Sequence, residues 1–372
     1  MTERLRVLHV GKFYPPHRGG MESHLELLCR RLAAEVDVEV VVSSDGRRTV
    51  RETVDGVPVT RVGTVATLAS ASVSPGLVQA IRRSPADVVH FHHPNPTAVL
   101  AYLASGHPGR LVVTYHSDIV RQKLLGALFD PVLHRFLRRA DAILASSPNY
   151  AAGSPVLRRH AARVHVVPFG VDADRFAHAP EAAREVRARY GPRIVLAVGR
   201  LVYYKGFDYL VRAMAQVDAT LVIVGDGPLR GDLERAAREA GAEGRVRFAG
   251  EAPDLLPYYH AADVFVLPSV ARSEAFGIAQ LEAMACGVPV VNTALETGVP
   301  FVSPHGVTGL TVPPADASAL AAAIGTLLAD PALRARLGAA GRERARGELG
   351  VERMVRRTLD VYRAAAGRAL PS

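Results

Sequence analysis

Short apolar runs alternate with longer amphipathic segments along nearly the whole chain, and this alternation restricts the fold more than any other feature of the sequence. The apolar run at 6–10 is followed by a glycine-rich loop, a helical segment and a second apolar run at 36–43. A strand, a helix and a strand in this order predict a parallel sheet. Further runs, apolar almost throughout as is typical of strands buried on both faces, lie at 86–92, 110–116, 140–147 and 163–170.

A second set of alternating segments follows a stretch that opens at Pro168 and Gly170 and is typical of an interdomain linker. Its apolar runs lie at 193–200, 219–227, 245–250, 262–269 and 288–293. The sequence therefore predicts an α/β protein with two Rossmann-like domains, residues 1–170 and 171–350, and a ligand site in the cleft between them. A helix within 351–372 is expected to pack back toward the first domain.

Composition excludes several classes of protein. No apolar run approaches the roughly 20 residues of a membrane span, and the N-terminus lacks the apolar region of a signal peptide. Two cysteines are too few for a disulfide framework or a zinc cluster, so a cytoplasmic protein is expected. The net charge of +9 favours an anionic partner, such as a nucleotide diphosphate or an anionic lipid surface. Nucleic acid is not expected, because the sequence has no dense basic tail and no nucleic-acid-binding signature.

A glycine-rich loop at 11–23 lies between the first expected strand and the first expected helix. Gly19 and Gly20 allow the backbone to approach a ligand closely, and the N-terminus of the following helix offers free N–H groups to an anion. A glycine-rich turn that binds nothing explains the same residues equally well in isolation.

Two cations lie where an expected strand of the second domain ends. Arg200 ends that strand, and Lys205 begins a helix five positions later. Such a pair would stabilise the negative charge that develops on a departing diphosphate, and anion sites form where a strand end meets a helix start. The alternative is a solvated pair of surface charges. Replacing either residue with alanine is expected to lower turnover and to leave stability almost unchanged.

Two glutamates, Glu274 and Glu282, are separated by seven residues, and a helix is expected to begin near Phe276. Glu282 then lies within the helix, whereas Glu274 lies on the loop before it, so different roles are expected for the two carboxylates. Both suit hydrogen bonding to sugar diols. Two unrelated surface glutamates are the alternative.

With these residues in place, the sequence resembles glycosyltransferase family four over nearly its whole length. The resemblance rests on the glycine pair in the first loop, on GR...KG at 199–206, on VGDGPLR at 224–230 and on the two spaced glutamates. It implies the GT-B fold, in which two Rossmann-like domains face each other across a cleft, and transfer that retains the anomeric configuration. Arg200 and Lys205 would hold the donor diphosphate, Glu274 would bind sugar hydroxyls and Glu282 the ribose.

The same resemblance implies further contacts with the donor. The backbone would approach the phosphates or the sugar at Gly19, Gly20, Phe276, Gly277 and Ile278. His116, at the end of the strand expected at 110–116, matches a position where the family often has a histidine near the transferred sugar, although a lone histidine is more often structural. The expected catalytic residues are thus His116, Arg200, Lys205 and Glu274.

The donor is indicated by a loop at 292–310, where NTALETGVPFVSPHGVTGL replaces the double-glycine loop more usual in the family. This loop is similar to those of bacterial O-antigen and exopolysaccharide mannosyl- or rhamnosyltransferases, which favours GDP-mannose as donor. UDP- and dTDP-sugars carrying GlcNAc, glucose or rhamnose are the alternatives. The expected acceptor is a hydroxyl of a glycan or lipid-linked glycan. Rivals of other classes are a nucleotide-sugar epimerase or phosphorylase and a basic binding protein without enzymatic activity.

No metal and no cofactor are expected. Asp172 and Asp174 form a D-x-D string, but it lies just past the expected linker, and the two cations already supply positive charge. His90, His92 and His93 have no matching carboxylate cluster, so acceptor contact or simple packing of a loop is the interpretation. The string GDGPLRG at 225–231 lacks the G-x-G-x-x-G spacing and is expected to be a strand-to-helix turn.

The segment 121–140 has apolar residues at helical spacing with basic residues between them, namely Arg121, Lys123, Arg135, Arg138 and Arg139. One hypothesis is peripheral docking at the inner face of an anionic membrane. The other is an ordinary amphipathic helix on the first domain, which Pro131 favours because proline is expected to interrupt the run.

Overall fold

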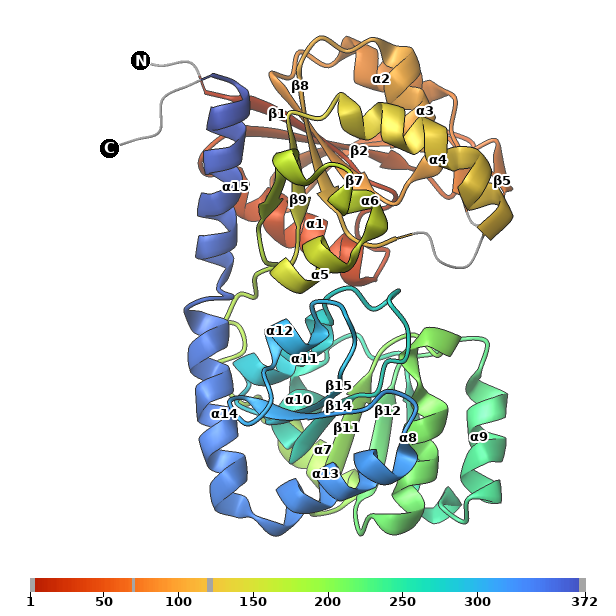
Figure 1. Ribbon diagram of the computed structural model, residues 1–372, viewed down its shortest axis with the longest axis vertical. Coiled ribbons are helices and arrows are strands. Elements are labelled where there is room, and N and C mark those ends of the chain that lie inside the picture. The colour runs from red at the N-terminus through yellow and green to blue at the C-terminus, as the bar shows by residue number, and fades with distance from the viewer. Residues whose placement is uncertain (1–3, 69–70, 119–122, 368–372) are drawn as a thin grey trace. The chain divides into compact units, whose positions relative to one another are not determined.

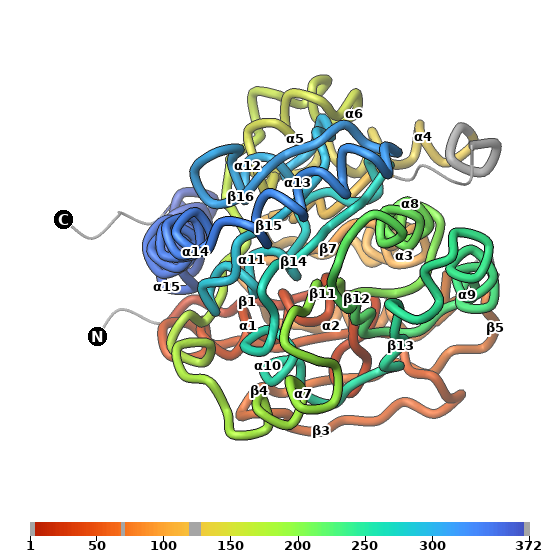
Figure 2. The backbone as a smooth tube through the Cα atoms, turned by 90° about the horizontal axis from the view of Figure 1, so that it is seen from below, coloured from red at the N-terminus to blue at the C-terminus, as the bar shows by residue number. Residues whose placement is uncertain are grey.

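A computed structural model describes residues 4–68, 71–118 and 123–367. The chain divides into two compact units, one of Met1–Phe169 and Val351–Ser372 and the other of Gly170–Gly350. Each unit has its own sheet of mainly parallel strands with helices packed on it (Figure 1, Figure 2). The expected α/β fold with two Rossmann-like halves is confirmed. Among the described residues, no helix has both the length and the apolar character that crossing a bilayer requires.

The first unit is built on an eight-stranded sheet. Its strands are β1 (Arg6–Val10), β2 (Asp37–Ser43), β3 (Val50–Val54), β4 (Val57–Val62), β7 (Val88–His93), β8 (Arg110–Tyr115), β9 (Ala142–Ala145) and β10 (Val164–Val166). Their order across the sheet is β10-β9-β8-β7-β1-β2-β4-β3. Neighbours run parallel except β3, which pairs antiparallel with β4. A separate antiparallel pair is formed by β5 (Ala66–Leu68) and β6 (Ala71–Val73).

Helices cover both faces of this sheet. They are α1 (Gly20–Leu32), α2 (Gly76–Arg83), α3 (Pro96–Ser105), α4 (Lys123–Arg138), α5 (Pro148–Gly153), α6 (Pro155–Arg158) and α15 (Val351–Ala365). Helix α15 packs against α1, and both contribute to one core with the sheet. Val88 of β7 belongs to that core, whereas Phe91 faces the other side and meets Phe136 of α4 edge-on, with ring centroids 4.8 Å apart. His90 and His92 therefore share the face of Val88, because successive strand side chains point to opposite faces.

Helix α4 differs from the expectation at Pro131, which lies inside the helix and does not interrupt it. A proline removes one backbone hydrogen bond and costs a helix interior about 3 kcal/mol. Burial of Leu133, Phe136 and Leu137 on the same helix offsets that cost. The expectation that Pro131 interrupts the run is therefore wrong, and Pro131 does not decide between an ordinary amphipathic helix and membrane docking. Arg121 lies outside the described residues.

The second unit has a six-stranded parallel sheet. Its strands are β11 (Ile194–Val198), β12 (Thr220–Val224), β13 (Val246–Gly250), β14 (Val264–Leu267), β15 (Val290–Thr293) and β16 (Gly309–Val312), in the order β13-β12-β11-β14-β15-β16. Its helices are α7 (Ala182–Tyr190), α8 (Phe207–Ala213), α9 (Arg230–Glu239), α10 (Leu256–Ala261), α11 (Ile278–Ala285), α12 (Val299–Val302), α13 (Ala317–Ala329) and α14 (Pro331–Arg346). The loops at the carboxyl ends of β11 and β14 carry Arg200, Lys205 and Glu274, whereas Glu282 lies on α11.

Candidate functional site

The loop between β11 and α8 presents Arg200 and Lys205 in different environments. Arg200 is exposed, and no ion pair to it is found among the residues that the structure describes. Lys205 ends a short turn, after which Gly206 has a φ of +64°. A Cβ at Gly206 would lie 2.2 Å from the carbonyl oxygen of Pro268, so only glycine lets this turn pack against the end of β14.

Lys205 forms an ion pair with Glu274. Its Nζ lies 2.6 Å from Oε2 of Glu274, and the hydroxyl of Ser269 donates to the same oxygen at 3.0 Å. Only 12% and 10% of the Lys205 and Glu274 side chains are exposed. Burial lowers the pKa of Lys205, but the charge of Glu274 more than compensates, and the net pKa of Lys205 is raised. Lys205 is therefore a charged ammonium whose counterion is held in place.

This ion pair corrects the expected effect on stability. Removing Lys205 alone would leave Glu274 as an uncompensated charge that is mostly buried, and breaking a buried pair costs about 3–5 kcal/mol. Alanine at Lys205 therefore destabilises the fold, contrary to the expectation from the sequence. The expectation stands for Arg200, which is exposed.

Glu282 lies in a different environment, on α11. Its Oε2 accepts a hydrogen bond of 2.6 Å from the hydroxyl of Tyr259 on α10. Burial raises the pKa of Glu282, and the Tyr259 hydrogen bond and the nearby Arg175 offset part of that rise. The two glutamates thus have separate partners, as their expected positions on loop and helix require.

The helix that carries Glu282 begins two residues later than expected, at Ile278. Gly277 caps it with a φ of +78°, and a Cβ there would lie 2.6 Å from Cδ2 of Leu267. Gln280 on the first turn donates to the carbonyl oxygens of Phe276 and Val299, at 2.9 and 3.1 Å. These bonds fix the backbone from Phe276 to Ile278, where the helix N-terminus offers N–H groups to an anion.

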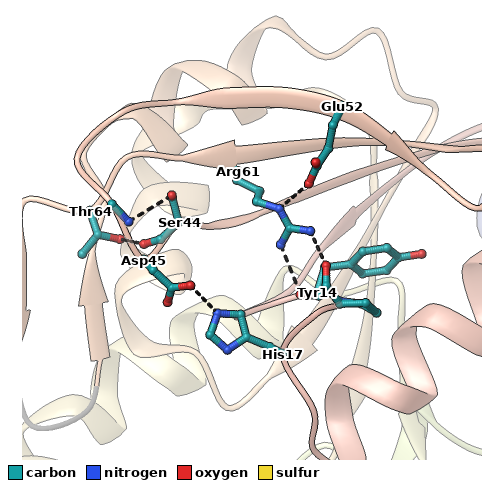
Figure 3. Close-up of polar contacts among 9 residues, drawn as sticks. Tyr14, His17, Ser44, Asp45, Glu52, Arg61 and Thr64 are labelled. Atoms are coloured by element: carbon teal, nitrogen blue, oxygen red, sulfur yellow. Dashed lines mark hydrogen bonds and ion pairs between the residues drawn. The ribbon is translucent and has the colours of Figure 1, made fainter. Parts of the chain in front are cut away.

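In the first unit, the glycine-rich loop leads directly into α1, which begins at Gly20 with Gly19 as its N-cap. The loop is tied to neighbouring strands by polar contacts (Figure 3). Arg61 of β4 donates to the carbonyl oxygen of Tyr14 at 3.1 Å and to that of Pro15, and it pairs with Glu52 of β3. His17 meets Asp45 at 2.7 Å. The antiparallel β3–β4 pair thereby positions the segment that presents Gly19 and Gly20.

His116 follows β8 and lies at the edge of a cluster of buried rings. Its Nε2 lies 3.0 Å from Nδ1 of His92, and its ring contacts His24 of α1 and Phe169, with centroids 5.3 and 5.2 Å away. Burial lowers the pKa of His116 well below its usual range, and His24 and His93 lower it further. His116 is therefore a neutral imidazole near pH 7, able to donate from one nitrogen and accept at the other.

Strand register explains why so many histidines meet here. His9 of β1 is paired in register with His90 of β7, and His92 is paired with Thr114 of β8. Each of these side chains points to the face covered by α1 and α15. His90 and His92 are buried by packing, as one of the two interpretations expected, but they lie on strand β7 and not on a loop. His93 points to the opposite face and stacks on Tyr115, with centroids 4.7 Å apart.

Two groups of rings have nitrogens close enough together for a metal ion: His9 with His90 and His92, and His24 with His92 and His116, each within 4.8 Å. Both nitrogens of His92 already take part in hydrogen bonds to other rings. A metal at either place would have to break one of these bonds. The absence of a metal site stays a prediction.

Two other strings have simple structural roles. The GDGPLRG turn connects β12 to α9, so the expected strand-to-helix turn is confirmed. A Cβ at Gly225 would lie 2.2 Å from the carbonyl oxygen of Gly199, so this turn packs directly on the backbone beside Arg200. The side chain of Asp174 is 93% exposed and lies 3.7 Å from Arg346.

Sequence reasoning missed several residues that contact the expected ones. They are Ser269 and Tyr259 in the second unit and His9, His24, Thr114 and Tyr362 in the first. The alternation of side chains along β1, β7 and β8 would have placed the strand residues on one face. Nothing in the sequence indicated Tyr259 or Tyr362 as partners, because both lie on helices far along the chain.

Comparison with known proteins agrees with this architecture. One family model, described as a glycosyl transferase 4-like domain, matches residues 19–170, and another, described as glycosyl transferases group 1, matches residues 179–344. The chain is 36% identical to a D-rhamnosyltransferase of Pseudomonas aeruginosa, over 88% of this chain and 87% of that protein. It is 35% identical to a GDP-mannose-dependent alpha-(1-6)-phosphatidylinositol monomannoside mannosyltransferase of Mycolicibacterium smegmatis, over 90% and 92%. A sucrose-phosphate synthase structure from Thermosynechococcus elongatus matches with a TM-score of 0.81 and 27% identity, over 97% and 99%.

Proposed function

This chain belongs to glycosyltransferase family four and is a hexosyltransferase that uses a nucleotide sugar, and we propose that its donor is GDP-mannose. The proposed acceptor is a hydroxyl of a glycan or lipid-linked glycan, and the anomeric configuration is retained. Because the chain belongs to this family, the epimerase, phosphorylase and non-enzymatic alternatives are set aside. The observation that carries the proposed transfer is the presence of two cations in one loop of the second unit. Arg200 is exposed, and Lys205 is charged and held in place by Glu274.

These cations would act on the leaving group. As the bond between the sugar and the diphosphate breaks, negative charge accumulates on the phosphate oxygens. Arg200 is available to meet that charge, and Lys205 is held in place by Glu274 at 2.6 Å. A cation that is fixed in advance, as Lys205 is, needs no reorganisation during the reaction, so it stabilises the transition state more than the bound donor.

The remaining proposed roles follow the positions of the side chains. Glu282 would grip the ribose, and Glu274 would orient the transferred sugar while it holds Lys205. His116, neutral and at the end of β8, would hydrogen-bond a hydroxyl of the sugar. We assign no covalent nucleophile, because attack is proposed on the face from which the diphosphate leaves.

The donor assignment is supported by the similarity to a GDP-mannose-dependent enzyme over nine-tenths of the chain. Saturation-transfer NMR with GDP-mannose, UDP-glucose, UDP-GlcNAc and dTDP-rhamnose tests it, because base and sugar signals are read separately. We expect the strongest transfer to the guanine and mannose protons of GDP-mannose. Preferential saturation of a UDP- or dTDP-sugar would assign the donor to that alternative.

We expect activity without any divalent metal. The two cations supply the positive charge that a metal would bring to the diphosphate, and Asp174 is already near Arg346. Overnight dialysis against EDTA should leave turnover within about twofold of the untreated enzyme. Loss of activity with EDTA and recovery with Mn²⁺ would contradict this, and Asp172→Asn/Asp174→Asn would then show whether the D-x-D string holds the metal.

We also propose that the first unit contacts an anionic membrane through α4. Beside α4 and α6 is a hollow lined by the exposed arginines Arg138, Arg159 and Arg163, together with Pro131 and the buried His134 and His160. Leu128 on the same helix is 77% exposed. Exposed arginines, together with an exposed apolar side chain on α4, suit the interface of an anionic bilayer.

This contact predicts flotation with vesicles of phosphatidylglycerol and phosphatidylcholine at low salt, and its loss at high salt. Arg138→Glu/Arg163→Glu should abolish flotation. Arg353→Glu/Arg356→Glu on α15 changes the net charge equally and should float like the wild type, because both arginines are exposed elsewhere on the first unit. Equal losses in both double variants, or no flotation of the wild type, would contradict a membrane contact at α4.

A further inference from the structure

A continuous line of hydrogen bonds runs through the buried face of the first unit. Its members, which we call the histidine chain, are in order Thr114, His90, Tyr362, His9, His92 and His116. Four of the six come from the neighbouring strands β1, β7 and β8, His116 directly follows β8, and Tyr362 comes from α15. Each member has at most 5% of its surface exposed.

The links use both nitrogens of every interior ring. His90 Nε2 lies 2.6 Å from Oγ1 of Thr114, and His90 Nδ1 lies 2.5 Å from the hydroxyl of Tyr362. That hydroxyl lies 3.3 Å from Nε2 of His9. His9 Nδ1 lies 3.1 Å from Nε2 of His92, whose Nδ1 lies 3.0 Å from Nε2 of His116.

The rings in the chain are neutral, which makes their tautomers interdependent. Burial lowers the pKa of His9 to about 3 and those of His90 and His92 well below the usual range, with neighbouring histidines adding to the effect. A neutral imidazole carries one proton, so it donates at one nitrogen and accepts at the other. Because the buried hydroxyl of Tyr362 must donate to one ring to pair its own proton, it accepts from the other, so one ring that donates toward His116 requires every ring to do so. The chain therefore has only two arrangements, which run in opposite directions.

Thr114 selects between these two arrangements. When Thr114 donates to His90, every O–H and N–H inside the chain has an acceptor. When the direction is reversed, the hydroxyl proton of Thr114 has no acceptor among the side chains and backbone that the structure describes. Leaving a buried donor unpaired is costly, so the direction from Thr114 toward His116 is favoured.

At the other end of the chain, the favoured direction leaves His116 accepting at Nε2 and protonated at Nδ1. No hydrogen bond to His116 Nδ1 is found in the described part of the chain. This atom is also not one of the fully buried side-chain nitrogens and oxygens that lack a hydrogen-bond partner. The proton at Nδ1 is thus available to a ligand. An N–H at this position can donate to a hydroxyl oxygen, whereas the opposite tautomer can only accept.

We propose that the histidine chain fixes His116 as the Nδ1–H tautomer, so that His116 donates a hydrogen bond to a hydroxyl oxygen of the sugar substrate. Tyr362 is a positioning residue in this account, because it acts on the substrate only through the rings between it and His116. The donation to a sugar rests on the proposed function, whereas the tautomer itself does not. The terminal helix α15 thereby takes part in setting up a residue at the end of β8.

The tautomer is read directly by long-range ¹H–¹⁵N correlation NMR of the imidazole rings near pH 7.5, with the His116 signals assigned by their loss in His116→Gln. We expect His116 in the wild type as a single Nδ1–H tautomer. An Nε2–H tautomer, or a mixture, would overturn the proposal. Spectra are recorded with and without EDTA, because a change on adding EDTA would show a metal on these rings and would equally overturn it.

Tyr362→Phe interrupts the chain while keeping the ring. His9, His92 and His116 then lose their link to Thr114, so both directions become accessible and His116 should become a mixture of tautomers. If about half of the molecules keep the productive tautomer, kcat falls about twofold at an unchanged donor KM. A single Nδ1–H tautomer in Tyr362→Phe would show that the chain does not set it.

Thr358→Val is the matched control, because Thr358 is a buried hydroxyl on the same helix that donates only to the carbonyl oxygen of Met354, at 2.8 Å. It should leave the tautomer and kcat unchanged. If Tyr362→Phe fails to fold, the wild-type spectrum still decides the proposal. The spectra are recorded without any sugar, so failure of the donor assignment is distinguishable from failure of the tautomer assignment. An Nδ1–H tautomer in a protein that does not bind GDP-mannose would overturn only the donor assignment.

Discussion

Replacing Arg200 with alanine should lower turnover by about 2–4 kcal/mol in the barrier, or roughly 30- to 1,000-fold in rate, with the fold intact. Arg200 is exposed, so its loss leaves no buried charge behind. Its proposed partner is the charge that grows on the leaving diphosphate, and this charge is larger in the transition state than in the bound donor. The measurement is kcat with saturating GDP-mannose, accompanied by the melting temperature.

Lys205→Ala should lower kcat by a similar factor and should also lower the melting temperature, because Glu274 loses its counterion. The double variant Lys205→Met/Glu274→Gln removes both charges, so it should recover much of the stability but none of the activity. Arg212→Ala on α8 is the control, since Arg212 makes only a long surface ion pair of 3.9 Å. Wild-type kcat in Arg200→Ala and Lys205→Ala would remove the diphosphate assignment.

Replacing Glu282 and replacing Glu274 should change different kinetic parameters, donor KM in the first case and kcat in the second. Glu282 is proposed to grip the ribose, which does not change during the reaction, so Glu282→Ala should raise donor KM by about tenfold or more with little effect on kcat. Glu274 orients the ring that gains positive charge and also holds Lys205, so Glu274→Ala should lower kcat by at least as much as Lys205→Ala does.

Glu274→Gln serves as the intermediate variant, because it keeps the shape and the hydrogen bond from Ser269 but loses the charge. Its kcat should fall between those of the wild type and Glu274→Ala. Tyr259→Phe tests the partner of Glu282 in the same way, and it should raise donor KM less than Glu282→Ala does. Equal changes of KM and kcat at Glu274 and Glu282 would refute the division of roles.

The sequence was sufficient for most of the architecture, because buried parallel strands are apolar almost throughout. The apolar run at 6–10 is β1 without any shift, and the longer runs were trimmed at their ends, as at 163–170, where β10 spans Val164–Val166. The β3–β4 hairpin was missed. Its turn at Asp55 and Gly56, with φ of 48° and 80°, is a recognisable hairpin signal, but β3 is largely exposed and has no apolar run to draw attention to it.

The candidate site was less accessible to sequence reasoning, because it depends on partners that are far apart in the chain. The positions of Arg200, Lys205 and the two glutamates at strand ends and helix starts could be predicted from local patterns. The ion pair between Lys205 and Glu274 could not, since it requires knowing that β11 and β14 are neighbours in the sheet. The histidine chain depends in the same way on the register of β1, β7 and β8 and on the docking of α15.

We propose that this enzyme transfers a hexose from GDP-mannose by means of Arg200 and Lys205, the two cations of the second unit. The direct measurement is nucleoside diphosphate release from a panel of GDP-, UDP- and dTDP-sugars, with and without glycan acceptors, for the wild type and Arg200→Ala. We predict that an acceptor stimulates GDP release from GDP-mannose, that the acceptor gains the mass of one hexose, and that Arg200→Ala abolishes most of both signals. Release from UDP- or dTDP-sugars alone, or GDP release unchanged in Arg200→Ala, would contradict the account.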